Sequence, residues 1–181
     1  MILRFLATLA MLLWLTACSS GAPPRPGDTL FDQLSGGQFT LHRDITIAPG
    51  RVRVIFQGGN AAYGASEFLP RCELEVRQIL ESPQTVAAGS YRIGKVFGIQ
   101  RYVNHPTGRI LLAAAGDPGR LAGTFNEWSM YTYHMQLLNA QQAHAATLIC
   151  GGSYNDPFHV RYPSLQEMQG ALGNYATLTL D

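Results

Sequence analysis

Apolar and polar residues alternate strictly in several segments of this chain, and this pattern sets narrow limits on its fold. In the segment RCELEVRQI, the apolar side chains of Cys72, Leu74 and Val76 alternate with polar ones, and in ATLIC the thiol of Cys150 is in phase with Leu148. Successive side chains of a β-strand point to opposite faces of a sheet. Both segments are therefore predicted to be half-buried strands with both thiols facing the core.

A similar alternation occurs earlier, in residues 38–47, whose apolar side consists of Phe39, Leu41, Ile45 and Ile47. Pro49 and Gly50 follow, and they suit a turn because proline fixes φ at the first central position while glycine accepts a positive φ at the second. Another apolar-alternating segment, residues 51–56, comes directly after them. Two strands around a short turn predict a β-hairpin.

Further strand-like segments, rich in β-branched and aromatic residues, occupy residues 84–103, 109–115 and 127–138. One helix is indicated near the C-terminus, where Ser164 and Glu167 have the spacing of a capping box. Neither an internal repeat nor a second domain boundary is visible in the sequence. These elements predict a mostly β domain, either an antiparallel sandwich or a partly open barrel, with a short C-terminal helix.

The first residues have the order of a secretory signal. Arg4 supplies one positive charge, and a largely apolar run, residues 5–17, follows it and ends in small residues. As a helix this run would rise only about 20 Å, less than the roughly 30 Å of a bilayer's hydrocarbon core. The pattern indicates export rather than a permanent membrane span.

The end of the signal, Leu15-Thr16-Ala17-Cys18, resembles the lipobox of bacterial lipoproteins. The resemblance implies that the signal is removed before Cys18, that a diacylglycerol is joined to its thiol and that its new amino group is acylated, commonly with palmitate. Ser19 follows in place of aspartate, which implies sorting to the outer membrane, facing the periplasm, in a Gram-negative host. The implied partners are membrane lipid, through acylated Cys18, and the lipoprotein maturation and sorting machinery. The alternative is a plain signal with an incidental cysteine.

The chain is thus expected to divide into a signal at 1–17, a lipidated cysteine with a flexible tether at 18–37, and one β-rich domain at 38–181. The residues after Cys18, SSGAPPRPGD, are polar and rich in proline and glycine, so they are not expected to pack a core. Cys72 and Cys150 lie in the exported body, and such a pair is predicted to form a disulfide in an oxidising compartment. Two separately buried thiols are the alternative.

Charge and motifs indicate which function classes are less expected. The chain has 13 basic and 12 acidic residues, and loss of Arg4 with the signal leaves the body near neutral. Such a body has no basic field to hold nucleic acid, so nucleic acid is not an expected partner. Nucleophile-elbow, metalloprotease, phosphate-loop and C-x-x-C motifs are all absent from the sequence. The missing motifs make an enzyme less expected without excluding one, and we predict no catalytic residue, no metal ligand and no cofactor.

Glu73 and Glu75 form the candidate carboxylate pair. Two residues apart on one strand face, their Cα atoms are about 6.5–7 Å apart, a separation compatible with the acid and base of a glycoside hydrolase. Arg77 continues the same row, however, and alternating charges on the outer face of an antiparallel strand are typical of exposure to water. The pattern favours a solvated face over a catalytic pair.

Three histidines lie in weaker settings. His42 and Asp44 are two residues apart on one polar face, but no nucleophile is marked nearby, which favours a surface pair. Asp156 and His159 could supply two ligands to a metal, although the residues around them favour a turn. His134 is either a binding residue or a solvent-facing strand residue, and its periodicity favours the second interpretation.

Six aromatic residues lie in or beside glycine-rich loops: Tyr63, Phe68, Tyr102, Phe125, Trp128 and Tyr154. Such rings either fold inward to cap the core or stay exposed to bind a peptide, a glycan or a partner protein. In layout the chain resembles small uncharacterised outer-membrane lipoproteins of proteobacteria, which bring no established activity to transfer.

The predicted function is a lipid-anchored envelope lipoprotein with a non-catalytic binding or assembly domain for an envelope protein or glycan. The alternative is a lipid-anchored hydrolase of envelope glycan or peptide that uses Glu73 and Glu75.

Overall fold

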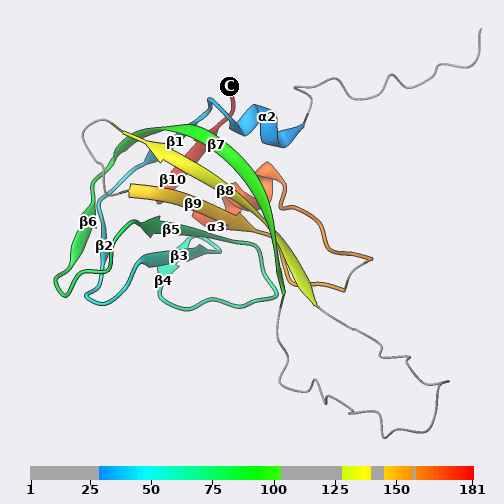
Figure 1. The fold of residues 1–181 in the computed structure, drawn as a ribbon, viewed down its shortest axis with the longest axis horizontal. Coiled ribbons are helices and arrows are strands. Elements are labelled where there is room, and N and C mark those ends of the chain that lie inside the picture. The colour runs from blue at the N-terminus through cyan, green and yellow to red at the C-terminus, as the bar shows by residue number, and fades with distance from the viewer. Residues whose placement is uncertain (1–28, 103–127, 140–144, 157) are drawn as a thin grey trace, which may run out of the picture.

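The computed structural model describes residues 29–102, 128–139, 145–156 and 158–181 (Figure 1). The strands are β1 (Gln38–Leu41), β2 (Ile45–Ile47), β3 (Arg53–Gln57), β4 (Asn60–Ala62), β5 (Arg71–Val76), β6 (Gln84–Val86), β7 (Gly89–Tyr102), β8 (Ser129–Leu138), β9 (Ala145–Gly151) and β10 (Ala176–Thr179). The helices are α2 (Leu30–Leu34) and α3 (Leu165–Leu172).

Eight of these strands form one antiparallel sheet in the order β10-β1-β7-β8-β9-β5-β3-β4. The sheet is curled into a half-barrel, and the long strands β7 and β8 follow its curve (Figure 1). A register shift between Ile93 and Val96 interrupts the β7–β8 ladder, and such irregularities bend a strand. The predicted mostly β fold with a C-terminal helix is confirmed, in the form of a partly open barrel.

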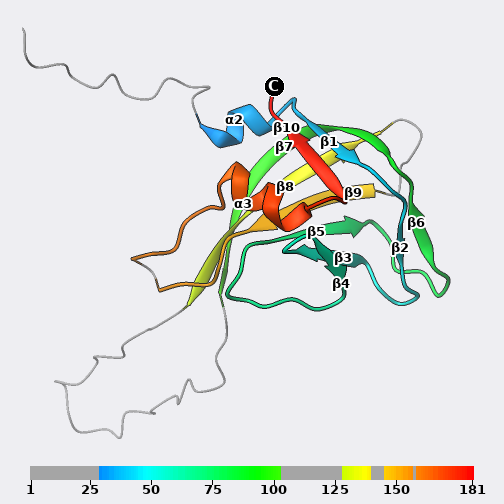
Figure 2. The same ribbon diagram turned by 180° about the vertical axis from the view of Figure 1, so that it is seen from behind.

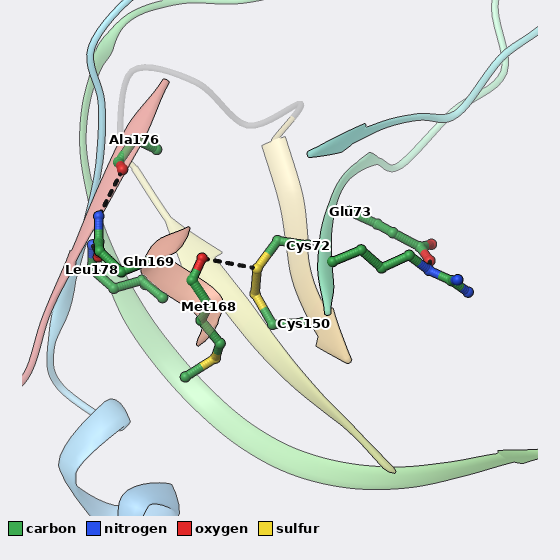
Figure 3. Close-up of a disulfide and its surroundings, with 8 residues drawn as sticks. Cys72, Glu73, Cys150, Met168, Gln169, Ala176 and Leu178 are labelled. Carbon is green, nitrogen blue, oxygen red and sulfur yellow. Dashed lines mark hydrogen bonds and ion pairs between the residues drawn. A yellow bond between two sulfur atoms is a disulfide. The ribbon is translucent and has the colours of Figure 1, made fainter. Parts of the chain in front are cut away.

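The main core lies on the side of the sheet that α3 covers. The helix packs against β3, β5 and β10 (Figure 2). Its capping box is confirmed, because the Ser164 hydroxyl accepts from the Glu167 amide at 3.2 Å and the Glu167 carboxylate accepts from the Ser164 amide at 2.8 Å. The Gln169 side chain then donates to the Ala176 carbonyl and accepts from the Leu178 amide, both at 3.0 Å (Figure 3). These bonds fix the helix to strand β10.

The predicted hairpin around Pro49 and Gly50 is wrong. The turn itself forms, with the Arg51 amide donating to the Ala48 carbonyl at 3.1 Å. However, β2 pairs with β6 in a separate two-stranded sheet, while β3 pairs with β4 and β5. The four apolar residues of the segment are buried as expected: Phe39, Leu41, Ile45 and Ile47. Alternation determined which side chains are buried, whereas the pairing partner depended on distant strands.

The folded domain begins before Gln38, inside the segment expected to be a flexible tether. Thr29 caps α2 by accepting from the Asp32 amide, and Leu34 is fully buried. The Phe31 ring meets the rings of Tyr133 and Tyr162 edge-on, at centroid distances of 4.7 and 5.1 Å. The start of the domain differs from the expected residue 38 because the segment LFDQL has enough apolar surface to pack against the sheet, unlike the proline-rich residues before it.

Candidate functional site

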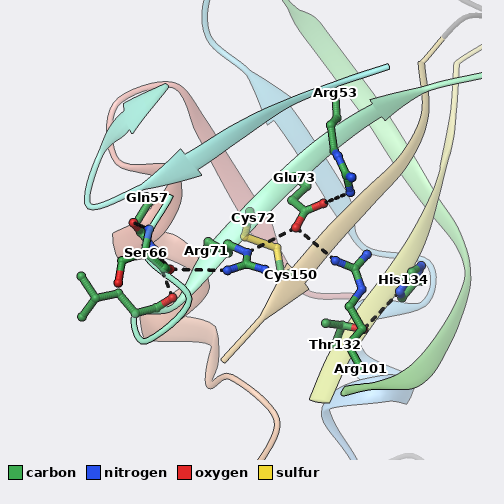
Figure 4. Close-up of polar contacts among 11 residues, drawn as sticks. Arg53, Gln57, Ser66, Arg71, Cys72, Glu73, Arg101, Thr132, His134 and Cys150 are labelled. Atoms are coloured by element: carbon green, nitrogen blue, oxygen red, sulfur yellow. Dashed lines mark hydrogen bonds and ion pairs between the residues drawn. A yellow bond between two sulfur atoms is a disulfide. The ribbon is translucent and has the colours of Figure 1, made fainter. Parts of the chain in front are cut away.

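Glu73 is the centre of a polar cluster on the face of the sheet opposite α3 (Figures 3 and 4). Its carboxylate accepts from Arg53 Nη1 at 2.7 Å, Arg71 Nε at 3.3 Å and Arg101 Nη1 at 3.2 Å. We call these four residues the Glu73 cluster. The arginines come from β3, β5 and β7, so one carboxylate joins strands that lie at the two ends of the series β7-β8-β9-β5-β3.

The alternation of β5 places the Glu73 cluster. Cys72 and Leu74 point into the main core, so Arg71 and Glu73 point to the other face. The prediction of a solvated face is wrong for Glu73, which is only 3% exposed. Arginine side chains from three strands converge over it, and they shield the carboxylate from water while supplying its hydrogen bonds (Figure 4).

Glu73 remains ionised at neutral pH. Burial by itself would raise the pKa of this carboxyl, but the charges of Arg101, Arg53 and Arg71 outweigh it and hold the pKa below the usual 4.5. A carboxylate in this state has no proton to donate, and both of its oxygens are engaged. The Glu73 cluster therefore carries a net charge of +2, three guanidinium groups against one carboxylate, which suits attraction of an anion.

A small second layer of packed side chains supports this face. Met130, Thr132 and Ile149 are buried there, outside the main core. Gly151 makes the layer possible, because a Cβ at this position would lie 2.7 Å from Met130 Sδ. The Thr132 hydroxyl donates to the Ile99 carbonyl at 3.0 Å. No pattern in the sequence predicts this layer, since these positions fall on the face expected to be polar.

His134 lies on the same layer and is half-buried rather than solvent-facing. Its ring stacks on Phe97 with a centroid distance of 5.2 Å, and its Nε2 lies 3.1 Å from the Thr132 hydroxyl. Burial and the charge of Arg101 lower the pKa of this imidazole below 6.5, while the Glu73 carboxylate opposes the shift. His134 is therefore coupled electrostatically to the Glu73 cluster.

A pocket of about 320 Å³ opens beside the cluster. We call it the Arg51 pocket. Its walls include the side chains of Arg51, Val52, Arg53, Ile55, Tyr63 and Glu73. The Tyr63 hydroxyl accepts from the Ala48 amide at 3.0 Å and donates to the Thr46 carbonyl at 3.3 Å, so its ring is held in place. A larger hollow of about 530 Å³ near α2 shares none of these residues.

The loop after β4 is tied to the same region. The Gln57 amide group donates to the Ser66 carbonyl and accepts from the Ser66 amide, both at 2.8 Å. Arg71 Nη1 donates to the same carbonyl at 3.4 Å (Figure 4). The loop is therefore positioned by the arginine that also binds Glu73.

The other carboxylates and histidines considered in the sequence do not form a catalytic pair with Glu73 or with one another. Glu75 is half-buried, opposite Arg53 in the β3–β5 ladder. His42 Nε2 lies 2.7 Å from the Thr177 hydroxyl, whereas Asp44 accepts from the Ala88 amide at 2.8 Å, so the predicted pair has separate partners.

Asp156 Oδ2 and His159 Nδ1 lie 2.7 Å apart, within hydrogen-bond distance. The Phe158 amide donates to Asp156 Oδ1 at 2.9 Å, and the His159 amide donates to the Asp156 carbonyl at 3.1 Å, which confirms the predicted turn. In the part of the chain that the structure describes, no group of three or more His, Cys, Asp or Glu side chains is placed to hold a metal ion.

The loop aromatics divide between the two predicted roles. Tyr154 is buried, whereas Tyr63, Phe68 and Tyr102 are about half exposed, at 48%, 58% and 53%. Trp128 is half-buried and meets Phe68 edge-on at 5.8 Å. Phe125 lies outside the described residues.

The predicted disulfide between Cys72 and Cys150 is confirmed (Figure 3). The two residues are directly opposite on β5 and β9, with their Cα atoms 4.1 Å apart. Cys72 directly precedes Glu73, so the disulfide lies on one side of the sheet and the Glu73 cluster on the other (Figure 4).

The predicted lipidation site, Cys18, lies outside the described residues. Within those residues, neither helix has the length and apolar character needed to cross a membrane.

The arginines of the Glu73 cluster were not predicted from the sequence. Arg71 stands two residues before Glu73 on the same strand face, a signal that was available, and Arg53 alternates with apolar residues in β3. Arg101 gave no such signal, because its approach to Glu73 depends on the curl of the sheet.

The chain was compared with known protein families, curated proteins and solved structures. No protein-family model, no curated protein and no solved structure matches this chain.

Proposed function

We propose that the protein is a lipid-anchored envelope lipoprotein whose β domain is a non-catalytic binding module, with the Glu73 cluster and the Arg51 pocket as its ligand-binding surface. The observation that carries the proposal is the net charge of +2 on the Glu73 cluster, together with the exposure of two of its arginines to solvent. The side chains of Arg53 and Arg101 remain 47% and 25% exposed although both bind Glu73. They can therefore contact a ligand while the carboxylate holds them in position.

The geometry of Glu73 favours binding over hydrolysis. A glycoside hydrolase needs one carboxylic acid that holds a proton and one carboxylate that reaches the substrate or a water. Glu73 is an ionised, buried carboxylate whose two oxygens are occupied by arginines. Its chemistry is that of a positioning residue, which orders guanidinium groups around it.

Crosslinking in intact cells tests the binding surface. We would place a photo-reactive amino acid at Tyr63, in the Arg51 pocket, and separately at Phe158, an aromatic residue that is 94% exposed on another loop. We expect defined crosslinked products from position 63 and none from position 158. Absence of products at position 63, or the same products at both positions, would contradict the proposal.

Glu75 separates binding from hydrolysis, because replacing it leaves the bonds of Glu73 intact. With Glu75→Gln we expect crosslinks from position 63 to persist, because the change removes a negative charge opposite Arg53 and not a donor, whereas Arg53→Gln should remove them. Loss in Glu75→Gln of a hydrolytic activity that the wild type shows on envelope glycan or peptide would favour the hydrolase alternative.

The anchor is tested separately. The lipobox resemblance of Leu15–Cys18 supports it, and two or three acyl chains would hold the protein stably at a membrane. Cys18→Ser should remove the lipid mass from the mature protein and its cofractionation with the outer membrane. A variant that stays in the outer membrane would contradict the anchor and leave the binding surface unaffected.

A further inference from the structure

We infer that the Arg51 pocket binds a phosphate monoester group, with Arg51 and Arg53 as the donors that contact it. The inference rests on the proposed function and names the chemistry of the ligand. It follows from the local charge, from the free donors of the two arginines and from the walls of the pocket.

The charge around the pocket matches a dianion. Four guanidinium groups belong to it or to the adjoining cluster: Arg51, Arg53, Arg71 and Arg101. Two carboxylates oppose them, Glu73 in the cluster and Glu75 directly across the ladder from Arg53. The balance is +2, and a phosphate monoester carries about −1.5 to −2 at pH 7. A carboxylate ligand would neutralise only half of this charge.

The two arginines have donors available for a ligand. Among the described residues, Arg53 gives only Nη1 to Glu73, and the guanidinium group of Arg51 donates no hydrogen bond. Arg51 instead lies with its Cζ 5.8 Å from the centroid of the Tyr63 ring. Guanidinium groups bind phosphate through paired N–H donors, so two of them at one pocket form a suitable receptor.

The walls of the pocket indicate what carries the phosphate. Val52 and Ile55 provide apolar surface, and the Tyr63 ring is fixed by its hydroxyl. A volume of about 320 Å³ admits a phosphate with a small attached group such as a polyol or a sugar. That group can belong to a soluble phosphomonoester or to the headgroup of a phospholipid, and both present the same chemistry to the arginines.

The test uses the full-length protein in mild detergent, titrated with inorganic phosphate, glycerol phosphate and acetate while amide NMR signals are followed. We expect saturable shifts for residues 50–55 and for Tyr63 with both phosphates, and at least about tenfold weaker binding of acetate, because its charge is half as large. Shifts confined to other residues, or equal binding of acetate, would overturn the inference.

Vesicles distinguish the two sources of phosphate. We would compare vesicles of phosphatidylcholine with vesicles that also contain phosphatidic acid. Preference for phosphatidic acid that disappears in Arg51→Gln assigns a lipid headgroup, while binding of glycerol phosphate without that preference assigns a soluble ligand. If the protein neither binds glycerol phosphate nor prefers vesicles that contain phosphatidic acid, the proposed phosphate site is refuted.

Matched arginine variants complete the experiment. Arg51 is exposed, so Arg51→Gln should fold normally and weaken phosphate binding about tenfold. Arg51→Lys should keep most of the affinity because it keeps the charge, and Arg92→Gln, an exposed arginine on β7, should bind like the wild type. If the protein does not bind phosphate but crosslinks from position 63 persist, the inferred phosphate ligand is wrong and the proposed binding function is kept. If both fail, the proposed function falls as well.

Discussion

At the scale of single residues, Glu73 organises the face of the sheet opposite α3. A carboxylate that is 3% exposed is stable there only because three guanidinium groups supply hydrogen bonds and opposite charge. The same interactions hold Arg53 and Arg101, whose side chains stay 47% and 25% exposed, whereas Arg71 is buried. Structure and proposed binding therefore depend on one side chain.

Glu73→Gln should destabilise the fold at pH 7 by about 2–4 kcal/mol, because it leaves three arginines facing an uncharged group. The folded pKa of Glu73 is below 4.5, so its contribution is fully present above that pH and is lost as the pH falls through the folded pKa. The difference between variant and wild type, measured by urea denaturation, should therefore shrink below about pH 4.5. Glu75→Gln on the same strand is the control and should change little.

His134 should report on the charge of Arg101. Burial and Arg101 hold its pKa below 6.5, so NMR titration of Arg101→Gln should show that pKa rising toward the unperturbed value. Arg43, whose guanidinium group lies over the Tyr175 ring, provides the control. The change Arg43→Gln should leave the pKa of His134 unchanged. Because the folded pKa is lowered, protonation favours the unfolded chain, and His134 should reduce stability as the pH falls below about 6.5. An unchanged pKa in Arg101→Gln would contradict the coupling.

At the scale of elements, α3 is positioned by its two ends. Its first turn is closed by the capping box of Ser164 and Glu167. At its other end, Gly173 has a φ of 55° and packs against the backbone of Gly59, whose amide donates to the Ala171 carbonyl at 3.1 Å. The C-terminal end of the helix is thus joined directly to the β3–β4 turn.

Two glycine substitutions in this region should have opposite effects. Gly173→Ala should destabilise the fold by more than about 1 kcal/mol, since its positive φ disfavours a side chain and a Cβ would lie 2.4 Å from Gly59 Cα. Gly170→Ala, where a Cβ would meet nothing within 4 Å, should stabilise it by about 0.5–1 kcal/mol through helix propensity. Thermal denaturation of both variants checks the pair, and a destabilised Gly170→Ala would contradict this account of α3.

At the scale of the whole molecule, the curl of the sheet and the disulfide determine how distant segments meet. The curl lets Arg101 of β7 reach Glu73 of β5 although β8 and β9 lie between them. The disulfide joins β5 to β9, and these cysteines are 78 residues apart in the chain. It crosslinks the strand that carries the Glu73 cluster to its neighbour.

Removing the disulfide should destabilise the domain by about 2–4.5 kcal/mol, because the crosslink restricts the unfolded chain over a long loop. The variant to test is the double replacement Cys72→Ala and Cys150→Ala, compared with the wild type by urea denaturation with and without dithiothreitol. Dithiothreitol should lower the stability of the wild type and leave the variant unchanged. Equal stability of oxidised wild type and variant would contradict the prediction.

Local residue spacing was enough to predict which strand side chains enter the main core, the mostly β fold and the short helix. Phe39, Leu41, Cys72 and Cys150 are all in the core because a period of two places alternate side chains on one face. The capping box of α3 was readable for a similar reason, since it depends on residues three apart in the chain. Such features are local, so local spacing is enough to predict them.

Strand pairing, the start of the domain and the candidate site depend on contacts between segments that are distant in the chain. Pairing of β2 with β6, and packing of Phe31 against Tyr133 and Tyr162, involve segments far apart in the chain. The charge row of β5 predicted exposure, yet Glu73 is buried because Arg53 and Arg101 arrive from other strands. Alternation specifies a face but does not specify what covers it, and here the curl of the sheet supplies that cover.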